Sequence, residues 1–193
     1  MSISDLTQFP SLSGFGSVTG VPWLEAGFGQ TFRSIYVGTG TVGLHAVVGG
    51  RGPALLLVPG WPQNWYTWSR MMLLLSQNFT VIAVDPRGTG LSDKPCDGYD
   101  ADTPAADLFA LMDRLGFADF YLAGHDVGMW IAFAMAATTP GRVRKVALGE
   151  AFIPGVFESP PIVCDDGQTN TFLWHHMFNR IDGVNVRLVE GRE

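Results

Sequence analysis

A glycine-rich stretch at residues 124–128 constrains the fold of this chain more than any other. It reads Gly-His-Asp-Val-Gly and joins two apolar runs. Residues 120–123 predict a short buried strand, and residues 129–137 predict a helix. Glycines two positions before and after Asp126 allow a close approach of the backbone, because a Cβ at either position would collide with its neighbours. The stretch therefore predicts a tight strand-to-helix turn that lifts Asp126 above the end of a sheet.

Two interpretations of Asp126 follow from this turn. Asp is a common helix N-cap, so the motif alone is compatible with a helix that simply begins there. The same geometry is that of a nucleophile elbow, which usually carries Ser at its centre. A carboxylate beside a helix N-terminus stays ionised and can attack carbon. The rest of the chain has to decide between the two.

Strands alternate with helices through the middle of the chain. Apolar runs predict strands at residues 32–37, 42–48, 54–58, 79–84, 120–123 and 143–148. Helical spacing of apolar residues predicts helices at 68–75, 104–115, 129–137, 172–178 and 184–190. This alternation predicts an α/β fold, with a mostly parallel sheet and helices on both faces. We expect an irregular leader (1–30), a core (31–150) and the start of a helical cap (151–193).

A literal GxGxxG motif at residues 38–43 has to be weighed against a dinucleotide site. Such a site needs its glycines after a strand and at the start of a helix, where the helix N-terminus meets the pyrophosphate. The β-rich residues 42–48 follow the motif here, without helical spacing. We therefore expect a hairpin turn between two strands.

Composition excludes several functional classes. The length of 193 residues and the 47% hydrophobic content predict one domain with a sizeable core. A net charge of −6 argues against a nucleic-acid partner. The sequence shows no signal peptide and no run long enough to span a membrane, so we expect a cytoplasmic location. Cys96 and Cys164 lie far apart without metal-ligand spacing, so neither a disulfide framework nor a metal site is indicated.

Three motifs resemble those of the α/β-hydrolase fold, in the branch of epoxide hydrolases and haloalkane dehalogenases. Residues 59–62, Pro-Gly-Trp-Pro, resemble its His-Gly-x-Pro turn. Residues 85–93 resemble its D-x-R-G-x-G-x-S-D loop, and residues 124–128 resemble its aspartate elbow. The order and spacing agree with the branch over residues 31–190. The resemblance favours the nucleophile interpretation of Asp126.

The resemblance implies a two-step reaction without a metal or organic cofactor. Asp126 would attack an epoxide carbon, and water would hydrolyse the resulting ester to a diol. The oxyanion formed in the second step needs backbone N–H donors, and Trp61 and Val127 are placed to supply them. The expected partner is a small-molecule substrate, an epoxide or another alkyl electrophile, while the oligomeric state stays open. Further residues expected to bind substrate are His125, Phe152, Trp174 and His175.

Epoxide hydrolysis is favoured over dehalogenation by the residue after the nucleophile. Haloalkane dehalogenases usually carry Trp there to hold the halide, and fluoroacetate-type dehalogenases usually carry Arg. This chain has Val127, which offers neither donor. A haloalkane or haloacetate dehalogenase remains the alternative enzyme. A truncated, non-catalytic hydrolase-like domain is the alternative of another class.

Two departures from the branch affect catalysis. Pro59 replaces the histidine that usually supports the oxyanion turn. The branch also places its catalytic acid and histidine after later strands, so we expect an N-terminal portion, truncated within the cap, that lacks both and is inactive alone. A substitute set of Asp126, His176 and Asp166 is conceivable, but their spacing gives the base no orienting partner.

Overall fold

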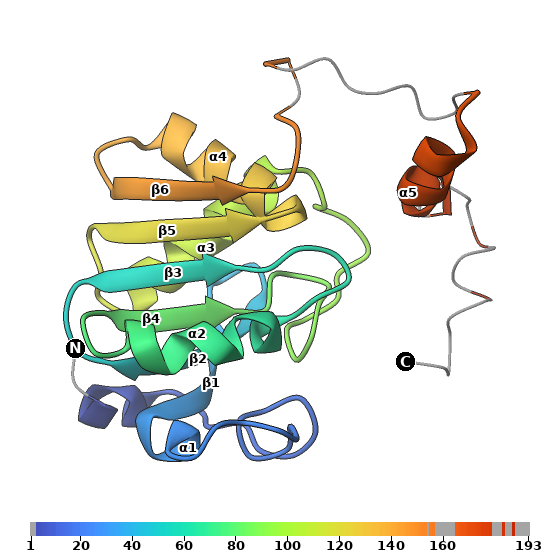
Figure 1. The fold of residues 1–193 in the computed structure, drawn as a ribbon. Coiled ribbons are helices and arrows are strands. Elements are labelled where there is room, and N and C mark those ends of the chain that lie inside the picture. Colours follow the sequence, from blue (N-terminus) through green and yellow to red (C-terminus); the bar gives the residue numbers. More distant parts are fainter. Residues whose placement is uncertain (1–2, 154, 157–164, 179–182, 184–186, 188–193) are drawn as a thin grey trace. The chain divides into compact units, whose positions relative to one another are not determined.

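One six-stranded sheet forms the centre of the structure, and helices cover both of its faces (Figure 1). The computed structural model describes residues 3–153, 155–156, 165–178, 183 and 187. The strands are β1 (Phe32–Gly38), β2 (Gly43–Gly50), β3 (Ala54–Val58), β4 (Thr80–Val84), β5 (Phe120–His125) and β6 (Val143–Gly149). The helices are α1 (Phe28–Thr31), α2 (Ser69–Leu75), α3 (Asp102–Arg114), α4 (Val127–Thr138) and α5 (Gly167–Phe178), with 3-10 helices η1 (Ile3–Gln8) and η2 (Trp65–Trp68).

The sheet is mostly parallel, as the sequence predicts. Its strand order is β1-β2-β4-β3-β5-β6. The pairs β3–β4, β3–β5 and β5–β6 are parallel, whereas β2 pairs antiparallel with both β1 and β4. The GxGxxG motif lies in the β1–β2 hairpin, where the Thr39 N–H donates to the Val42 carbonyl at 2.9 Å. The predicted hairpin is confirmed, and no helix follows these glycines.

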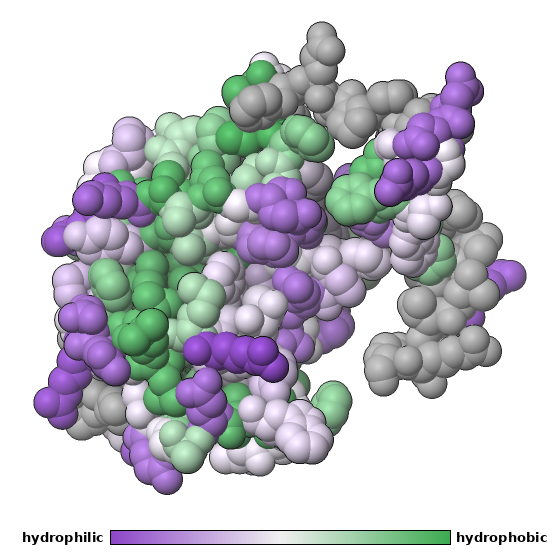
Figure 2. Space-filling model, viewed as in Figure 1, coloured by the Kyte–Doolittle hydropathy of each residue, from purple (hydrophilic) through white to green (hydrophobic). Residues whose placement is uncertain are grey.

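Two apolar layers enclose the sheet because side chains alternate along each strand. In β3, Leu56 and Val58 belong to the layer that packs against α3 and α4. Leu55 and Leu57 point to the other layer, which includes Met72 of α2. Hydrophobic side chains gather on the face that carries α2 (Figure 2). Both layers position the strand ends on which the site is built.

The N-terminal segment, residues 3–31, packs against the α2 side of the molecule as well as against β1. Phe28 is stacked on Phe32, with ring centroids 4.6 Å apart, and both side chains are buried. Val18 is also buried, and Ser11 forms an isolated bridge with Ile35. Sequence patterns gave no period for this segment, yet it supplies part of the apolar layer on the α2 side.

The chain divides into two compact units, residues 1–151 and 152–193. The first contains the whole sheet, and the second contains α5, where a helix was predicted at residues 172–178. The assignment of residues 151–193 to a cap stays a prediction, and of the helix predicted at 184–190 only Arg187 is among the described residues. No described helix has the length and apolar character that crossing a membrane requires.

Candidate active site

The turn between β5 and α4 holds Asp126 in a strained backbone conformation. Its φ is 54° and its ψ is −123°, values that a residue with a Cβ rarely adopts. A Cβ on Gly124 would lie 2.2 Å from the Gly128 carbonyl oxygen, and one on Gly128 would lie 2.4 Å from the Val58 carbonyl oxygen. Both glycines are therefore required by close backbone approach. Asp126 occupies the N-cap position of α4, but its side chain makes no capping hydrogen bond.

A second turn, after β3, brings a backbone donor to the Asp126 carboxylate. The Trp61 N–H donates to Asp126 Oδ1 at 2.8 Å. Strands β3 and β5 pair in parallel with Val58 opposite Gly124, so both turns leave the same sheet edge. A Cβ on Gly60 would lie 2.5 Å from the Asp126 Cβ, which explains why glycine precedes Trp61. The Trp61 side chain is 41% exposed, so it is not a core aromatic.

Val127 begins α4 directly after the carboxylate. Its side chain is half-buried against the apolar layer that includes α3 and α4. Within the described part of the chain, no hydrogen bond joins the Val127 N–H to Asp126. The structure thus brings Trp61 into contact with Asp126, while Val127 adjoins it only in sequence.

His125 ends β5 and lies beside an acidic residue that sequence reasoning missed. His125 Nε2 lies 3.7 Å from Glu150 Oε2, and both side chains are partly exposed. Glu150 follows β6 with a φ of 78°, the second strained non-glycine residue at this edge. The two strand ends are tied together because the Asp126 N–H donates to the Gly149 carbonyl at 3.0 Å. Glu150 directly follows a parallel strand, and this position in the sequence could have identified it.

The other predicted binding residues belong to the second compact unit. Phe152 is 56% exposed. Trp174 and His175 lie on α5, where the Trp174 ring contacts His175 at a centroid distance of 6.3 Å. Asp166 caps this helix: its Oδ2 accepts from the Thr169 N–H at 2.8 Å and from the Thr169 hydroxyl, which lowers the pKa of the carboxyl. These contacts give Asp166 a structural role in α5.

The histidine nearest the N-terminus lies in the core, where it contacts a buried carboxylate. His45 on β2 is fully buried, and its Nδ1 lies 2.7 Å from Asp85 Oδ2. It therefore has no access to water at the Asp126 edge. Among the described residues, no group of three or more His, Cys, Asp or Glu side chains is arranged to hold a metal ion.

The loop after β4, residues 85–93, contributes two further carboxylates near this edge. Asp93 lies at its end and accepts from the Tyr36 hydroxyl at 2.6 Å and from the Gly43 N–H at 2.8 Å. Both hydrogen bonds lower the pKa of Asp93, and the one from Tyr36 has the larger effect. The hydrogen bond between the two side chains also raises the pKa of Tyr36. Asp85, at the start of the loop, is buried.

Comparison with known proteins places this architecture among hydrolases. The family model for the alpha/beta hydrolase fold matches residues 53–192. A soluble epoxide hydrolase of Corynebacterium sp. (strain C12) is 39% identical over 116 residues, which are 60% of this chain and 40% of that protein. A fluoroacetate dehalogenase of Burkholderia sp. is 41% identical over 124 residues, 62% of this chain and 41% of that protein.

Solved structures agree with the sequence comparison. Wild-type Cfl2 from Burkholderia cenocepacia superimposes with a TM-score of 0.77 at 40% identity, over 83% of this chain and 55% of that one. The chain spans about two fifths of the length of the curated relatives that it matches. The matches support an N-terminal portion of an α/β-hydrolase. The resemblance inferred from three motifs is confirmed: this chain belongs to the α/β-hydrolase fold family, and epoxide hydrolases are among the proteins to which it is similar.

Proposed function

We propose that Asp126 is the nucleophile of an epoxide hydrolase reaction. Its carboxylate attacks an epoxide carbon, the carbon–oxygen bond of the ring breaks, and the leaving alkoxide takes up a proton. The product of this step is an ester between Asp126 and the substrate. The observation that carries the proposal is the strained elbow with the Trp61 N–H 2.8 Å from Asp126 Oδ1. That contact holds one carboxylate oxygen and orients the other for attack.

Hydrolysis of the ester is the second step. Water adds to the Asp126 carbonyl carbon, and the oxyanion that develops is stabilised by the N–H groups of Trp61 and Val127. Collapse of this intermediate releases a diol and restores the carboxylate. Val127 lies at the first turn of α4, where N–H groups have no partner within the helix. The Trp61 contact with Oδ1 supports its part of this role.

Efficient hydrolysis also requires a general base, and the histidines of this chain are poorly suited to it. His45 is buried against Asp85. His125 directly precedes Asp126 and lies beside Glu150, so we assign it to the substrate-facing surface. His175 and His176 are neighbours on α5, with ring centroids 4.4 Å apart. We propose that the 193-residue chain accumulates the ester and turns over little.

Mass spectrometry of the intact chain tests this proposal. Incubation with styrene oxide should add one substrate mass, and peptide mapping should locate it on Asp126. The Asp126→Asn variant should stay unmodified under the same conditions. Sustained production of diol over many turnovers by the purified chain would contradict the proposed accumulation. An unmodified wild-type chain would contradict the assignment of Asp126.

Dehalogenation is the second candidate, favoured by the relative named fluoroacetate dehalogenase at 41% identity. A fluoroacetate site would need cationic donors beside the nucleophile, and the residues that follow Asp126 are Val127, Gly128 and Met129. Fluoride release from fluoroacetate, without reaction of the epoxide, would select this alternative. Phe152, Trp174 and His175 are proposed to contact the substrate in either case. The absence of both reactions would favour a non-catalytic domain.

A further inference from the structure

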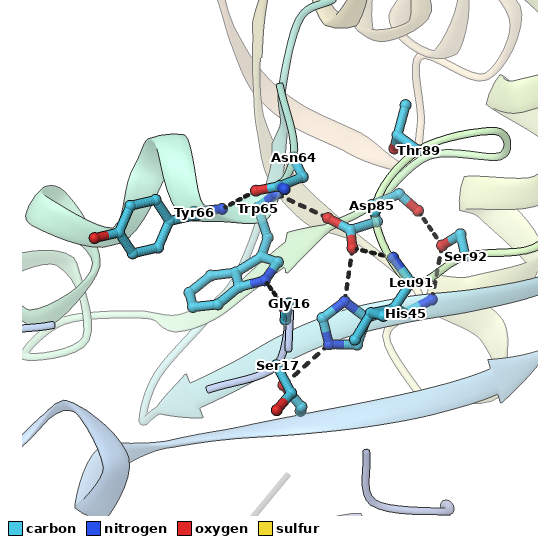
Figure 3. Close-up of polar contacts among 12 residues, drawn as sticks. Gly16, Ser17, His45, Asn64, Trp65, Tyr66, Asp85, Thr89, Leu91 and Ser92 are labelled. Carbon is cyan, nitrogen blue, oxygen red and sulfur yellow. Dashed lines mark hydrogen bonds and ion pairs between the residues drawn. The ribbon is translucent and has the colours of Figure 1, made fainter. Parts of the chain in front are cut away.

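A buried hydrogen-bond network joins the backbone of Trp65 to the loop after β4 and to strand β2 (Figure 3). Its centre is the Asp85 carboxylate, which is fully buried. Oδ1 accepts from the Trp65 N–H at 2.8 Å, and Oδ2 accepts from the Leu91 N–H at 2.9 Å. His45 Nδ1 lies 2.7 Å from the same Oδ2. One side chain thus ties together the turn after β3, the loop after β4 and strand β2.

The hydrogen-bond network continues from Asp85 through His45 to the N-terminal segment. A carboxylate only accepts, so His45 Nδ1 donates to Asp85 Oδ2. The Ser34 hydroxyl lies 3.0 Å from Nε2 on the other side of the ring. Ser34 Oγ in turn accepts from the Val18 N–H at 3.0 Å. Each buried polar atom along this path has a partner, which favours a rigid arrangement.

The N-terminal segment closes the network from the other side of Trp65. The Trp65 indole Nε1 donates to the Gly16 carbonyl at 2.8 Å. Its ring also lies 5.9 Å from the Phe28 ring, centroid to centroid. Trp65 is therefore held at its backbone by Asp85 and at its ring by the N-terminal segment, and the side chain is fully buried.

Trp65 lies only four residues after Trp61, and the chain between them is a closed turn. The Gln63 N–H donates to the Gly60 carbonyl at 2.9 Å, which closes the turn and connects the Trp61 backbone to that of Trp65 over a short distance. We infer that Asp85 and His45 are positioning residues, which hold the Trp61 N–H against the Asp126 carboxylate and link it to the N-terminal segment. As a role in catalysis, this inference rests on the proposed ester chemistry of Asp126.

Replacement of Asp85 by Asn isolates this role because it keeps the shape of the side chain. The amide has one oxygen, whereas the carboxylate receives backbone N–H groups on both of its oxygens. Either the Trp65 N–H or the Leu91 N–H must then face an amide NH2. The orientation with the amide oxygen at the position of Oδ2 serves both the Leu91 N–H and His45 Nδ1, so we expect it to be preferred. The Trp65 N–H then faces the NH2 and loses its acceptor without a change in side-chain volume.

Asp107→Asn is the matched control. Asp107 is buried and accepts from Arg87 Nε at 2.6 Å and from the Thr41 hydroxyl at 2.9 Å. It has no contact with the turn at residues 60–65 among the described hydrogen bonds. Both variants therefore lose a buried carboxylate, but only the Asp85 variant loosens Trp61.

Two measurements test the inference in the full 193-residue chain. The first is the backbone amide resonance of Trp61 in wild type, Asp126→Asn, Asp85→Asn and Asp107→Asn. We expect Asp85→Asn to shift this resonance toward its position in Asp126→Asn, and Asp107→Asn to leave it unchanged. The second is the rate of ester formation with styrene oxide. Its maximal value should fall at least about tenfold in Asp85→Asn, with the half-saturating concentration unchanged, because a small misplacement of a reacting group is costly.

His45 provides a graded version of the same test. His45→Asn retains an N–H at the position of Nδ1 and should keep most of the wild-type rate. His45→Leu removes that donor and should approach the rate of Asp85→Asn. Equal rates in His45→Asn and His45→Leu would contradict a role that acts through the Asp85 contact.

The outcomes separate this inference from the proposed function. An unshifted Trp61 resonance in Asp85→Asn, or equal losses of rate in Asp85→Asn and Asp107→Asn, overturns the positioning role. If the Trp61 resonance shifts in Asp85→Asn but the wild-type protein never forms the ester, the structural link is upheld and the assignment of Asp126 as nucleophile is rejected instead.

Discussion

Asp85 directly follows β4 and Asp126 directly follows β5, two strands that run parallel in the same sheet, yet the surroundings of the two carboxylates are opposite. Asp85 is fully buried, and its carboxylate accepts two backbone N–H groups and faces an imidazole. Asp126 has a strained backbone and receives the Trp61 N–H on Oδ1 in an exposed contact. A saturated carboxylate stabilises structure, whereas one with an oxygen left free can react. The hydrogen-bond environment, rather than the residue type, distinguishes the buried carboxylate from the proposed nucleophile.

The largest effect should come from Asp126→Asn. The amide is a poor nucleophile, so the styrene oxide adduct should be lost completely. Asn tolerates positive φ as well as Asp does, so the free energy of unfolding should change by less than about 0.5 kcal/mol. Urea denaturation measures this change. A large loss of stability would mean that Asp126 is structural, like Asp85.

Gly128→Ala should break the elbow itself. The added Cβ would lie 2.4 Å from the Val58 carbonyl oxygen and 2.5 Å from that of Pro59, both of which are backbone atoms. We expect a loss of about 3 kcal/mol in the free energy of unfolding, at the upper end of ordinary substitutions. Gly141→Ala is the control, because a Cβ there meets nothing within 4 Å. A similar loss in both variants would show that glycine matters here for reasons other than backbone contact.

Glu150→Gly should sharpen the contrast by removing strain next to Asp126. Glu150 has a φ of 78°, a conformation that glycine adopts freely. The free energy of unfolding should rise by about 1 kcal/mol, because the left-handed conformation costs roughly that much for a residue with a Cβ. Thermal denaturation would detect the gain. A loss of stability would mean that the carboxylate contributes more than its backbone strain costs.

Asp93 offers a solvent-exposed carboxylate for comparison, and Tyr36→Phe removes its hydroxyl partner. The Tyr36 hydrogen bond lowers the pKa of Asp93, so its stabilisation is present above the usual pKa of about 4. That stabilisation is lost as the pH falls through the lowered value. The free energy of unfolding of the wild type should exceed that of the variant by less than about 1 kcal/mol at pH 7, since water screens the contact. Urea midpoints at pH 7 and pH 3 should show the difference shrinking at the lower pH, and an unchanged difference would contradict the linkage.

The sequence predicted the sheet and the elbow well, because both depend on local patterns. The apolar runs marked the strands, and the glycines around Asp126 marked the turn that their missing Cβ atoms permit. The contact between Trp61 and Asp126 was also expected, since adjacent parallel strands end at one edge. These patterns indicate which residues are buried and where the backbone makes close contacts within a short stretch of sequence.

The Asp85 network was beyond the reach of such patterns. His45 and Asp85 are 40 residues apart, and Trp65 and Gly16 are 49 apart. Periodicity indicates which residues are buried but not which buried polar atoms meet. The φ of Glu150 was equally inaccessible, because a strained residue contradicts its local preference and is held only by its surroundings. The roles of His125, Phe152, Trp174 and His175 stay predictions.

The strand order has a consequence for how the chain folds. β3 lies between β4 and β5, both of which follow it in sequence, so β3 is paired on both sides only after β5 has been synthesised. The hydrogen bond from Trp61 to Asp126 spans 65 residues. Contacts between residues so far apart in sequence form slowly, because a long loop must close, at a cost in entropy, before the contact can stabilise the chain. During synthesis the Trp61 turn has to wait for the elbow to emerge from the ribosome, so the site is assembled late in folding.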